Sequence, residues 1–384
     1  MFPVIEISGP PFARGRTHGR LAKARVERSL ANYASLFGHC GIDWSEAQRL
    51  GAGYRDVIGD LDPALLEEME GIAAGAGRKP NEILALNART EILPPTFPGK
   101  PSAEWLASRL GSPVDFGECT AIAVSPERSA TGAAQLAQNW DWLGAQREAL
   151  VLLRIRGTDG STCVTLTEAG MLAKIGCNDR GLGVCLNILR SEDDGAQPGV
   201  PVHVLLRALL GCASVAEAIE MAMKLRFGAS SNILCADAAG EAAALELSPA
   251  GAHVVREHDG TLCHTNHFLA PEALRAEVAL PPSLSSQPRL ACARRHAAAR
   301  AKLGIGELQA LLRDETDGLL SVCRRPDPSL PEEARVESVA SVIMELARGV
   351  MHVAPDVPSR TEYQPIDMKW GQSDSIGTLL RKSA

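Results

Sequence analysis

The pattern of apolar residues changes at Cys119, and this change limits the folds that the chain can adopt. Up to about residue 93, stretches such as "RTHGRLAKARVERSLANYASLF" and "PALLEEMEGIAAGAG" carry apolar residues at helical spacing, after a short strand at "PVIEIS". From Cys119 onward, short apolar runs alternate with turn residues, which predicts strands. Residues 94–118 lie between the two parts. They are rich in Pro, Gly and Ser and predict an exposed connecting segment.

The second part predicts several strands and two helical stretches. Strands are expected in "TAIAV", "AAQLAQNW", "ALVLLRIRG", "STCVTLTEA", "MLAKIG" and "GLGVCLNIL". A helical stretch follows at residues 201–225, then three or four strands over residues 230–268, a helix in "PRLACARRHAAARAKL" and a hairpin in "ESVASVIMELARGVMHVAP". The order of helices, strands, helices and strands predicts two antiparallel sheets stacked between helical layers.

Composition excludes several classes of protein. The 384 residues are 45% hydrophobic, which is enough for a large core. A net charge of −7 argues against nucleic acid or an anionic membrane surface as the main partner. We see no signal peptide and no run of 18 apolar residues, so no membrane span is expected. The ten cysteines form no C-x-x-C pair, and most are expected to be buried in a reducing cytoplasm.

Two familiar kinds of cysteine site fit the sequence poorly. Cys263, His264 and His267 in "CHTNHF" offer zinc ligands, but no second cluster supplies a fourth, so buried strand histidines and no metal or cofactor are the better interpretation. A Cys-His hydrolase would need a base for Cys119, and nothing near it matches the papain or caspase signatures. Composition alone favours an ordinary core cysteine.

A third hypothesis explains why a cysteine begins a strand. If the peptide bond before Cys119 is cut, that residue gains a free α-amine, which titrates near 7.7–8.0 and can take the thiol proton at neutral pH. The site would still need an acceptor for the ammonium and donors for an oxyanion. Asp141, between two tryptophans in "QNWDW", is a candidate for the first, and asparagines elsewhere for the second.

Taken in order, the motifs resemble the acyl-coenzyme A:isopenicillin N acyltransferase-like family of N-terminal-nucleophile hydrolases. They are "GPPFARGRTHGRL", "LALNARTEI", "CTAIAV", "AQNWDW", "EAGMLAKIGCNDRGLGVCLNIL", "CHTNHF", "SSQPRLACARR" and "ASVIMELARGVMHVAPDVP". Choloylglycine hydrolases and acid ceramidase are more distant relatives. The resemblance implies a four-layer αββα sandwich, made as a precursor whose two chains, residues 1–118 and 119–384, form one structural unit.

The resemblance also assigns roles to residues. Cys119 matches the nucleophile that the precursor exposes by cutting itself after Glu118, and Asp141 matches the carboxylate that holds the new α-amine. Asn266 matches an oxyanion-hole asparagine, and Asn187 matches a second asparagine in the same site. An arginine near the nucleophile is matched by Arg289. Further candidates for substrate binding are Gln138, Trp140, His267 and Ser286.

The chain departs from the family pattern at a few positions. Glu118 stands where the acyltransferase has Gly, which puts the efficiency of cleavage in question. Gln138 replaces the arginine of the choloylglycine branch. Ser286 is the hydroxyl nearest in sequence to Arg289, whose direct neighbour is a proline here. We also expect Arg89 and Glu91 to form a structural ion pair.

The sequence therefore predicts a cytoplasmic, self-processing amidohydrolase that cleaves a linear N-acyl amide through a thioester. Acyl transfer from acyl-coenzyme A or an amide donor to an amine is the first alternative. It would be favoured by a basic, phosphate-binding patch near the site, which the sequence alone does not identify. An uncut homologue that only binds ligands is the second alternative. The acyl group, the amine and the oligomeric state, including a homo-oligomer, stay open.

Overall fold

The computed structural model describes residues 1–93, 119–195, 197–256, 259–276, 284–330, 332 and 335–368. The connecting segment predicted at residues 94–118 lies outside these ranges, and so does Glu118, the residue before the expected cut.

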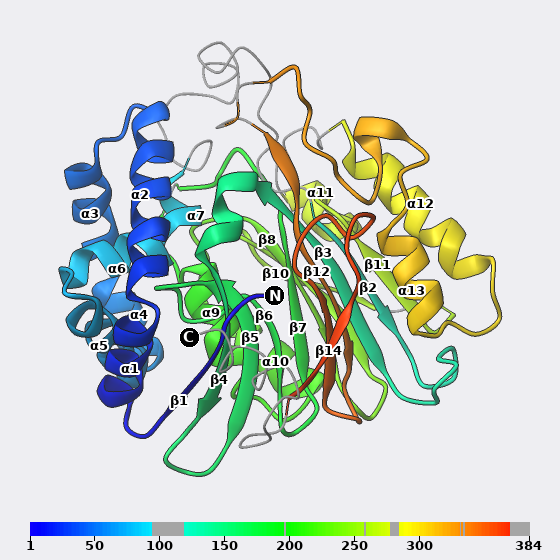
Figure 1. The fold of residues 1–384 in the computed structure, drawn as a ribbon, viewed down its shortest axis with the longest axis horizontal. Helices are drawn as coiled ribbons and strands as arrows, with labels where there is room; N and C mark the ends of the chain where they lie inside the picture. The colour runs from blue at the N-terminus through cyan, green and yellow to red at the C-terminus, as the bar shows by residue number, and fades with distance from the viewer. Residues whose placement is uncertain are drawn as a thin grey trace, which may run out of the picture.

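Two sheets face each other in the centre of the molecule (Figure 1). The eight-stranded sheet has the order β1 (Val4–Ser8), β4 (Leu150–Arg156), β5 (Thr162–Glu168), β6 (Ile175–Asn178), β7 (Gly183–Ile188), β8 (Ser231–Ala236), β9 (Ala242–Ser248) and β10 (Gly251–Arg256). The six-stranded sheet has the order β11 (Thr261–His264), β2 (Thr120–Val124), β3 (Gln135–Leu143), β12 (Val336–Glu345), β13 (Val350–Ala354) and β14 (Gln364–Asp367).

Helices cover the outer face of each sheet, which gives the four layers (Figure 1). On the side of the eight-stranded sheet lie α1 (Pro11–Leu21), α2 (Lys23–His39), α3 (Trp44–Ala52), α4 (Arg55–Leu61), α5 (Pro63–Ala76), α6 (Pro80–Asn87), α7 (Arg89–Ile92), α9 (Val202–Leu209) and α10 (Val215–Met223). The six-stranded sheet is covered by α12 (Ser286–Ala298) and α13 (Ile305–Leu312), and the short α11 (Pro271–Ala276) precedes them. Among the described helices, none has the length and apolar character that crossing a membrane requires.

The predicted αββα architecture is confirmed, with two corrections. β1 pairs in parallel with β4, so the eight-stranded sheet is not purely antiparallel. A parallel pair needs a long crossover, and the helices of the first part of the chain lie within it. The helical stretch expected at residues 201–225 is two helices, because the chain turns after α9 and Ser214 caps α10 by accepting a hydrogen bond from the Glu217 N–H.

Strand sequences follow from this layering. Every residue of β2 and of β12 is buried, since each strand has a sheet on one side and a helical layer on the other. Continuous burial on both faces requires apolar or internally bonded side chains instead of a strict polar alternation. This is why "TAIAV" carries no charge, and why the polar residues of neighbouring strands have to find partners inside the protein.

Helices α1 and α5 pack with their backbones nearly in contact. Each helix carries two glycines four residues apart, and a Cβ added at any of them would lie 2.0–2.2 Å from a backbone oxygen of the partner helix. The glycines are Gly15, Gly19, Gly71 and Gly75. Only glycine allows this approach, so the position of the first helical layer depends on these four residues.

We predict that Gly15→Ala lowers the free energy of unfolding by about 1–3 kcal/mol, because the new methyl group would overlap the carbonyl oxygen of Glu68. Urea unfolding followed by circular dichroism measures the change. Gly38→Ala is the matched control, since it lies in α2 with no atom within 4 Å of an added Cβ. A Gly15→Ala protein as stable as the wild type would contradict the close packing.

Candidate active site

Cys119 lies immediately before β2. At this end of the six-stranded sheet it is close to three other predicted residues, Asn187, Asn266 and Arg289. β2 pairs with β3 on one side and with β11 on the other. β3 continues to Asp141, and the chain leaving β11 continues to Asn266. The thiol-bearing residue is 4% exposed, so it is part of the interior and not of the surface.

The backbone of Cys119 is held by three side chains from separate elements. Its N–H donates to Asn266 Oδ1 at 2.8 Å. Its carbonyl oxygen accepts from Asn187 Nδ2 at 3.0 Å and from Arg289 Nη1 at 2.7 Å. Asn187 comes from β7 of the facing sheet and Arg289 from α12 of the outer layer. The structure therefore brings four predicted site residues into direct contact.

The contacts of Asn266 fix the orientation of its amide. Its Oδ1 faces two groups that can only donate, the Cys119 N–H and Arg289 Nη2 at 3.0 Å. Its Nδ2 donates to the carbonyl oxygen of Ile188 at 2.9 Å. Asn187 likewise uses its Nδ2 on the carbonyl of Cys119. In this state both asparagines hold the backbone of the cysteine.

Asp141 is fully buried and only half satisfied. Its Oδ1 accepts from the Ser338 hydroxyl at 2.6 Å, while Oδ2 has no hydrogen-bond partner within the described ranges. Burial raises the pKa of this carboxyl to about 7, against the opposing effects of Arg289 and Ser338. The backbone N–H of Asp141 interacts with the Cys119 thiol. A cationic amine at Cys119 would give this carboxylate the partner that it lacks.

Burial also controls the pKa of the Cys119 thiol. It raises the pKa of Cys119 to about 11, and the neighbouring Asp141 adds to this effect. Lys174, the Asp141 N–H and Arg289 act in the opposite direction. No histidine is among the groups that act on the thiol in the described part of the chain, so a Cys-His pair finds no support there.

Lys174 and Glu168 were not predicted from the sequence. Lys174 precedes β6, and its ammonium lies 3.7 Å from the centre of the Trp140 ring and 3.8 Å from Glu168 Oε2. The available signal was a lone lysine inside the apolar run "MLAKIG", a position where a charge must be paired or solvated. Ser338 was also missed, because its contact with Asp141 depends on the pairing of two strands distant in sequence.

The expected ion pair in "NARTEI" has a different partner. Arg89 Nη2 lies 3.5 Å from Glu168 Oε1. Glu91 Oε1 accepts from the Val202 N–H at 2.8 Å and so caps the start of α9. Both residues are buried and connect the first helical layer to the rest of the protein.

The four candidates for substrate binding make internal contacts. The Gln138 side chain exchanges two hydrogen bonds with the backbone of Leu186 in the facing sheet. The Ser286 hydroxyl accepts from the Asn266 N–H at 2.9 Å and lies 2.7 Å from His267 Nδ1. Trp140 lies against Lys174. Their role toward a substrate stays a prediction. The Arg289 guanidinium donates to the hydroxyls of Ser285 and Thr120, each at 3.1 Å.

The histidine-rich segment is satisfied by protein contacts. His264 Nε2 lies 2.8 Å from Glu246 Oε1 and Nδ1 lies 2.8 Å from the Thr265 carbonyl oxygen, so both ring nitrogens are occupied. Within the described ranges, a different group brings potential metal-ligand atoms within 4.8 Å of one another, namely Cys292, His296 and Asp314.

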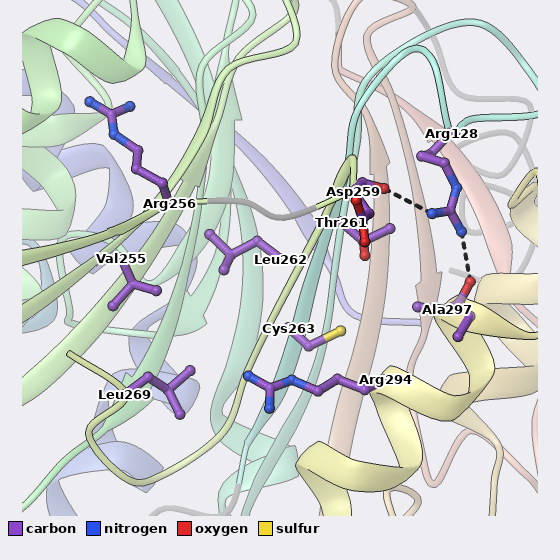
Figure 2. A pocket seen from close by; sticks show the side chains of 11 residues that line it. Arg128, Val255, Arg256, Asp259, Thr261, Leu262, Cys263, Leu269, Arg294 and Ala297 are labelled. Atoms are coloured by element: carbon purple, nitrogen blue, oxygen red, sulfur yellow. Dashed lines mark hydrogen bonds between the residues drawn. The ribbon is translucent and has the colours of Figure 1, made fainter. Parts of the chain in front are cut away.

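A pocket of about 460 Å³ opens beside β11 and α12. Figure 2 shows Leu262, Cys263 and Leu269 along one wall and Arg294 reaching in from α12. Arg128 and Arg256 also contribute to its lining. The Arg128 guanidinium is used on backbone carbonyls, including those of Asp259 and Ala297. The sequence alone did not identify this basic pocket, which adjoins β11, the strand just before Asn266, and α12, the helix that carries Arg289.

The chain is similar to proteins of known activity. Residues 129–359 match the family model described as "Acyl-coenzyme A:6-aminopenicillanic acid acyl-transferase". Over 291 residues, the chain is 31% identical to the acyl-coenzyme A:6-aminopenicillanic-acid-acyltransferase 40 kDa form of Emericella nidulans, covering 74% of this chain and 75% of that protein.

Two solved structures are similar to this chain. A conjugated bile acid hydrolase variant from Clostridium perfringens is 13% identical, covers 65% of this chain and 92% of its own, and has a TM-score of 0.46. A penicillin V acylase from Agrobacterium tumefaciens is 15% identical, covers 65% and 86%, and has a TM-score of 0.47.

The raised pKa of Asp141 predicts a pH-dependent stability in a Cys119→Ala chain that cannot cut itself. The folded protein keeps the Asp141 proton up to pH near 7, whereas the unfolded chain releases it near pH 3.9. The free energy of unfolding therefore falls as pH rises through this window. In the Cys119→Ala background, adding Asp141→Asn should remove about 1–2 kcal/mol of the decline between pH 5 and pH 7.

Chemical denaturation at a series of pH values measures this effect. Asp159→Asn is the matched control, because Ser161 lowers the pKa of that exposed carboxyl and it stays ionised throughout the window. Equal pH slopes with and without Asp141→Asn would contradict the assignment.

Proposed function

The chain belongs to the acyl-coenzyme A:6-aminopenicillanic acid acyl-transferase family, and we propose that it is a self-processing amidohydrolase with an amino-terminal cysteine that cleaves linear N-acyl amides. The observation that carries the proposal is the environment of Cys119. Its N–H and carbonyl are fixed by Asn266, Asn187 and Arg289, with a half-satisfied buried carboxylate close by.

Maturation would begin with attack of the Cys119 sulfur on the carbonyl carbon of Glu118. The carbon–sulfur bond forms, the peptide carbon–nitrogen bond breaks, and the nitrogen takes a proton to become an amine. Water then hydrolyses the resulting thioester between residues 118 and 119, which leaves a carboxylate on residue 118 and a free thiol on residue 119. Asn266 Oδ1, which already accepts from this nitrogen, would hold the new amine together with Asp141.

The two products, residues 1–118 and 119–384, would stay together. β1 pairs with β4 along five register positions, helix α2 contacts β5, and helix α6 contacts α9 of the second part of the chain. One chain would thus become two without loss of the common core.

In the mature enzyme the α-amine would take the thiol proton, and the thiolate would attack the acyl carbon of the substrate. The Asp141 N–H, which lowers the pKa of the thiol by hydrogen bonding, would donate to the oxyanion. Asn266 Nδ2 would join it by leaving the Ile188 carbonyl. The ammonium then protonates the leaving amine, and water resolves the thioester.

All ten cysteines are free and buried, which supports a reducing cytoplasm.

The experiment that tests this proposal is the intact mass of the wild type and of Cys119→Ala under denaturing, reducing conditions. We expect two wild-type fragments that meet between Glu118 and Cys119, and one full-length species for the variant. The fragments should then hydrolyse members of a panel of N-acyl amides.

A single uncut wild-type chain would contradict self-processing and would favour a ligand-binding homologue without catalysis. The variant Ser125→Ala is a suitable second control. It removes a buried hydroxyl at the far end of β2, the strand that Cys119 precedes, and should leave cleavage intact.

Acyl transfer from acyl-coenzyme A is the second candidate, and the basic pocket beside β11 favours it. Arg294 is exposed there, and a guanidinium is suited to binding phosphate. We predict that Arg294→Glu raises the KM for an acyl-coenzyme A donor about tenfold or more and leaves hydrolysis of a simple N-acyl amide unchanged.

The matched control is Arg295→Glu, which reverses a charge on the same helix outside the pocket lining. Initial rates with both substrates give the comparison. Equal effects of the two variants, or no turnover of acyl-coenzyme A by the wild type, would remove this candidate.

A further inference from the structure

The buried ammonium of Lys174 is a charged group that the mechanism above does not use. The Lys174 side chain is 5% exposed and extends from the loop before β6 toward the inner face of the six-stranded sheet. There its Nζ lies 3.7 Å from the ring centre of Trp140 and 6.0 Å from that of Trp142. An ammonium over an aromatic face is attracted to the ring. Contact with two tryptophan rings does not compensate for the hydration that the ammonium loses on burial.

Strand register places this ammonium on the same side of the sheet as the nucleophile. Thr120 pairs with Asn139 in the antiparallel β2–β3 ladder. Continuing that register by one residue sets Cys119 opposite Trp140. Opposite residues in such a pair point to the same face, with Cβ atoms about 4.5–5.5 Å apart. The ring that carries the Lys174 ammonium is therefore the cross-strand neighbour of Cys119.

A network on the opposite side fixes the position of Lys174. Its Nζ lies 3.8 Å from Glu168 Oε2. The other oxygen, Oε1, accepts from the Tyr33 hydroxyl at 2.6 Å and lies 3.5 Å from Arg89 Nη2. The Arg89 guanidinium is itself stacked over the rings of Tyr33 and Trp142. Glu168 therefore contacts the Lys174 ammonium on the side opposite Trp140. Within the described ranges, the ammonium makes no hydrogen bond that would compete with an interaction with the thiol.

We propose that Lys174 is a positioning residue for the reaction, and that its buried ammonium stabilises the thiolate of Cys119 from the side of the eight-stranded sheet. This inference rests on the proposed role of Cys119 as nucleophile. Arg289, the other cation at the site, is already engaged by the carbonyl oxygen of Cys119, the Thr120 hydroxyl and Asn266. The acceptor beside the Lys174 ammonium is Glu168, 3.8 Å away, and the Trp140 ring against which the ammonium lies is the cross-strand neighbour of Cys119.

Electrostatics agree with this geometry. Lys174 lowers the pKa of Cys119 more than Arg289 does, and Cys119 in turn raises the pKa of Lys174. Burial lowers the pKa of Lys174 to about 7, Glu168 raises it and Arg89 lowers it. The ammonium therefore persists below about pH 7 and is lost above it unless the thiolate forms beside it. Among the described residues, the charged or titratable groups around the pair include Asp141, Glu168, Arg89, Arg289, Tyr33, His203 and Cys185.

The test is the pH dependence of alkylation of Cys119 by iodoacetamide in the full chain, followed by mass spectrometry of the peptide that contains Cys119. Lys174→Met keeps the length of the side chain and removes the charge. We expect the apparent pKa of alkylation to rise by about one unit, with a tenfold slower reaction at pH values below it. Lys174→Arg should restore the rate to within about threefold of the wild type.

Two further variants make the outcome decisive. Lys224→Met is the matched control, because it removes an exposed lysine that pairs with Glu220, and its alkylation profile should equal that of the wild type. Glu168→Gln removes the counter-charge of Lys174 and should shift the thiol in the same direction as Lys174→Met. If Lys174→Met fails to fold, Glu168→Gln decides the question.

An unchanged alkylation profile in a folded Lys174→Met protein, or in Glu168→Gln where the first variant does not fold, would overturn the proposal and leave Lys174 a packing residue. The peptide mass also records whether Cys119 is amino-terminal or internal. Failure of self-processing is therefore distinguished from failure of the lysine to act on the thiol.

Discussion

A single buried guanidinium joins the outer helical layer to Cys119, the proposed nucleophile. Arg289 is fully buried and donates to the Cys119 carbonyl, the Thr120 hydroxyl, Asn266 Oδ1 and the Ser285 hydroxyl. A buried cation without such acceptors would be strongly destabilising. The fork geometry of the guanidinium therefore requires the start of β2 and the turn after β11 to lie in fixed positions beside α12.

The same lack of water opposes ionisation of the thiol and of its neighbouring carboxyl. Burial raises the pKa of both Cys119 and Asp141, so in the uncut chain each tends to keep its proton. A free amine at residue 119 would change this balance, because a cation between a thiolate and a carboxylate compensates both. Under the proposed mechanism, the α-amine would supply the positive charge that a peptide nitrogen cannot carry.

Local sequence patterns predicted the layers, because periodicity depends on neighbours in the chain, whereas Asn266, Asn187 and Arg289 were assigned through the resemblance of short motifs to a known family. Ser338 and Lys174 escaped prediction because their roles follow from strand pairing and from the contact between the two sheets. The orientation of the Asn266 amide depends on donors from two other elements. The helix α13 and the strand β14 were also missed, since each is short and takes its stability from the six-stranded sheet.

The parallel strand β1 has a consequence for how such a site can be made. A ribosome starts every chain with methionine, so an amino-terminal cysteine at residue 119 requires a cut in the chain. Here the first strand is hydrogen-bonded to β4 and the cysteine is already seated among strands, helix and facing sheet. If the proposed cut occurs in this folded state, the new amino-terminus at Cys119 would already contact its partner residues. Residues 1–118 would remain bound as a separate subunit.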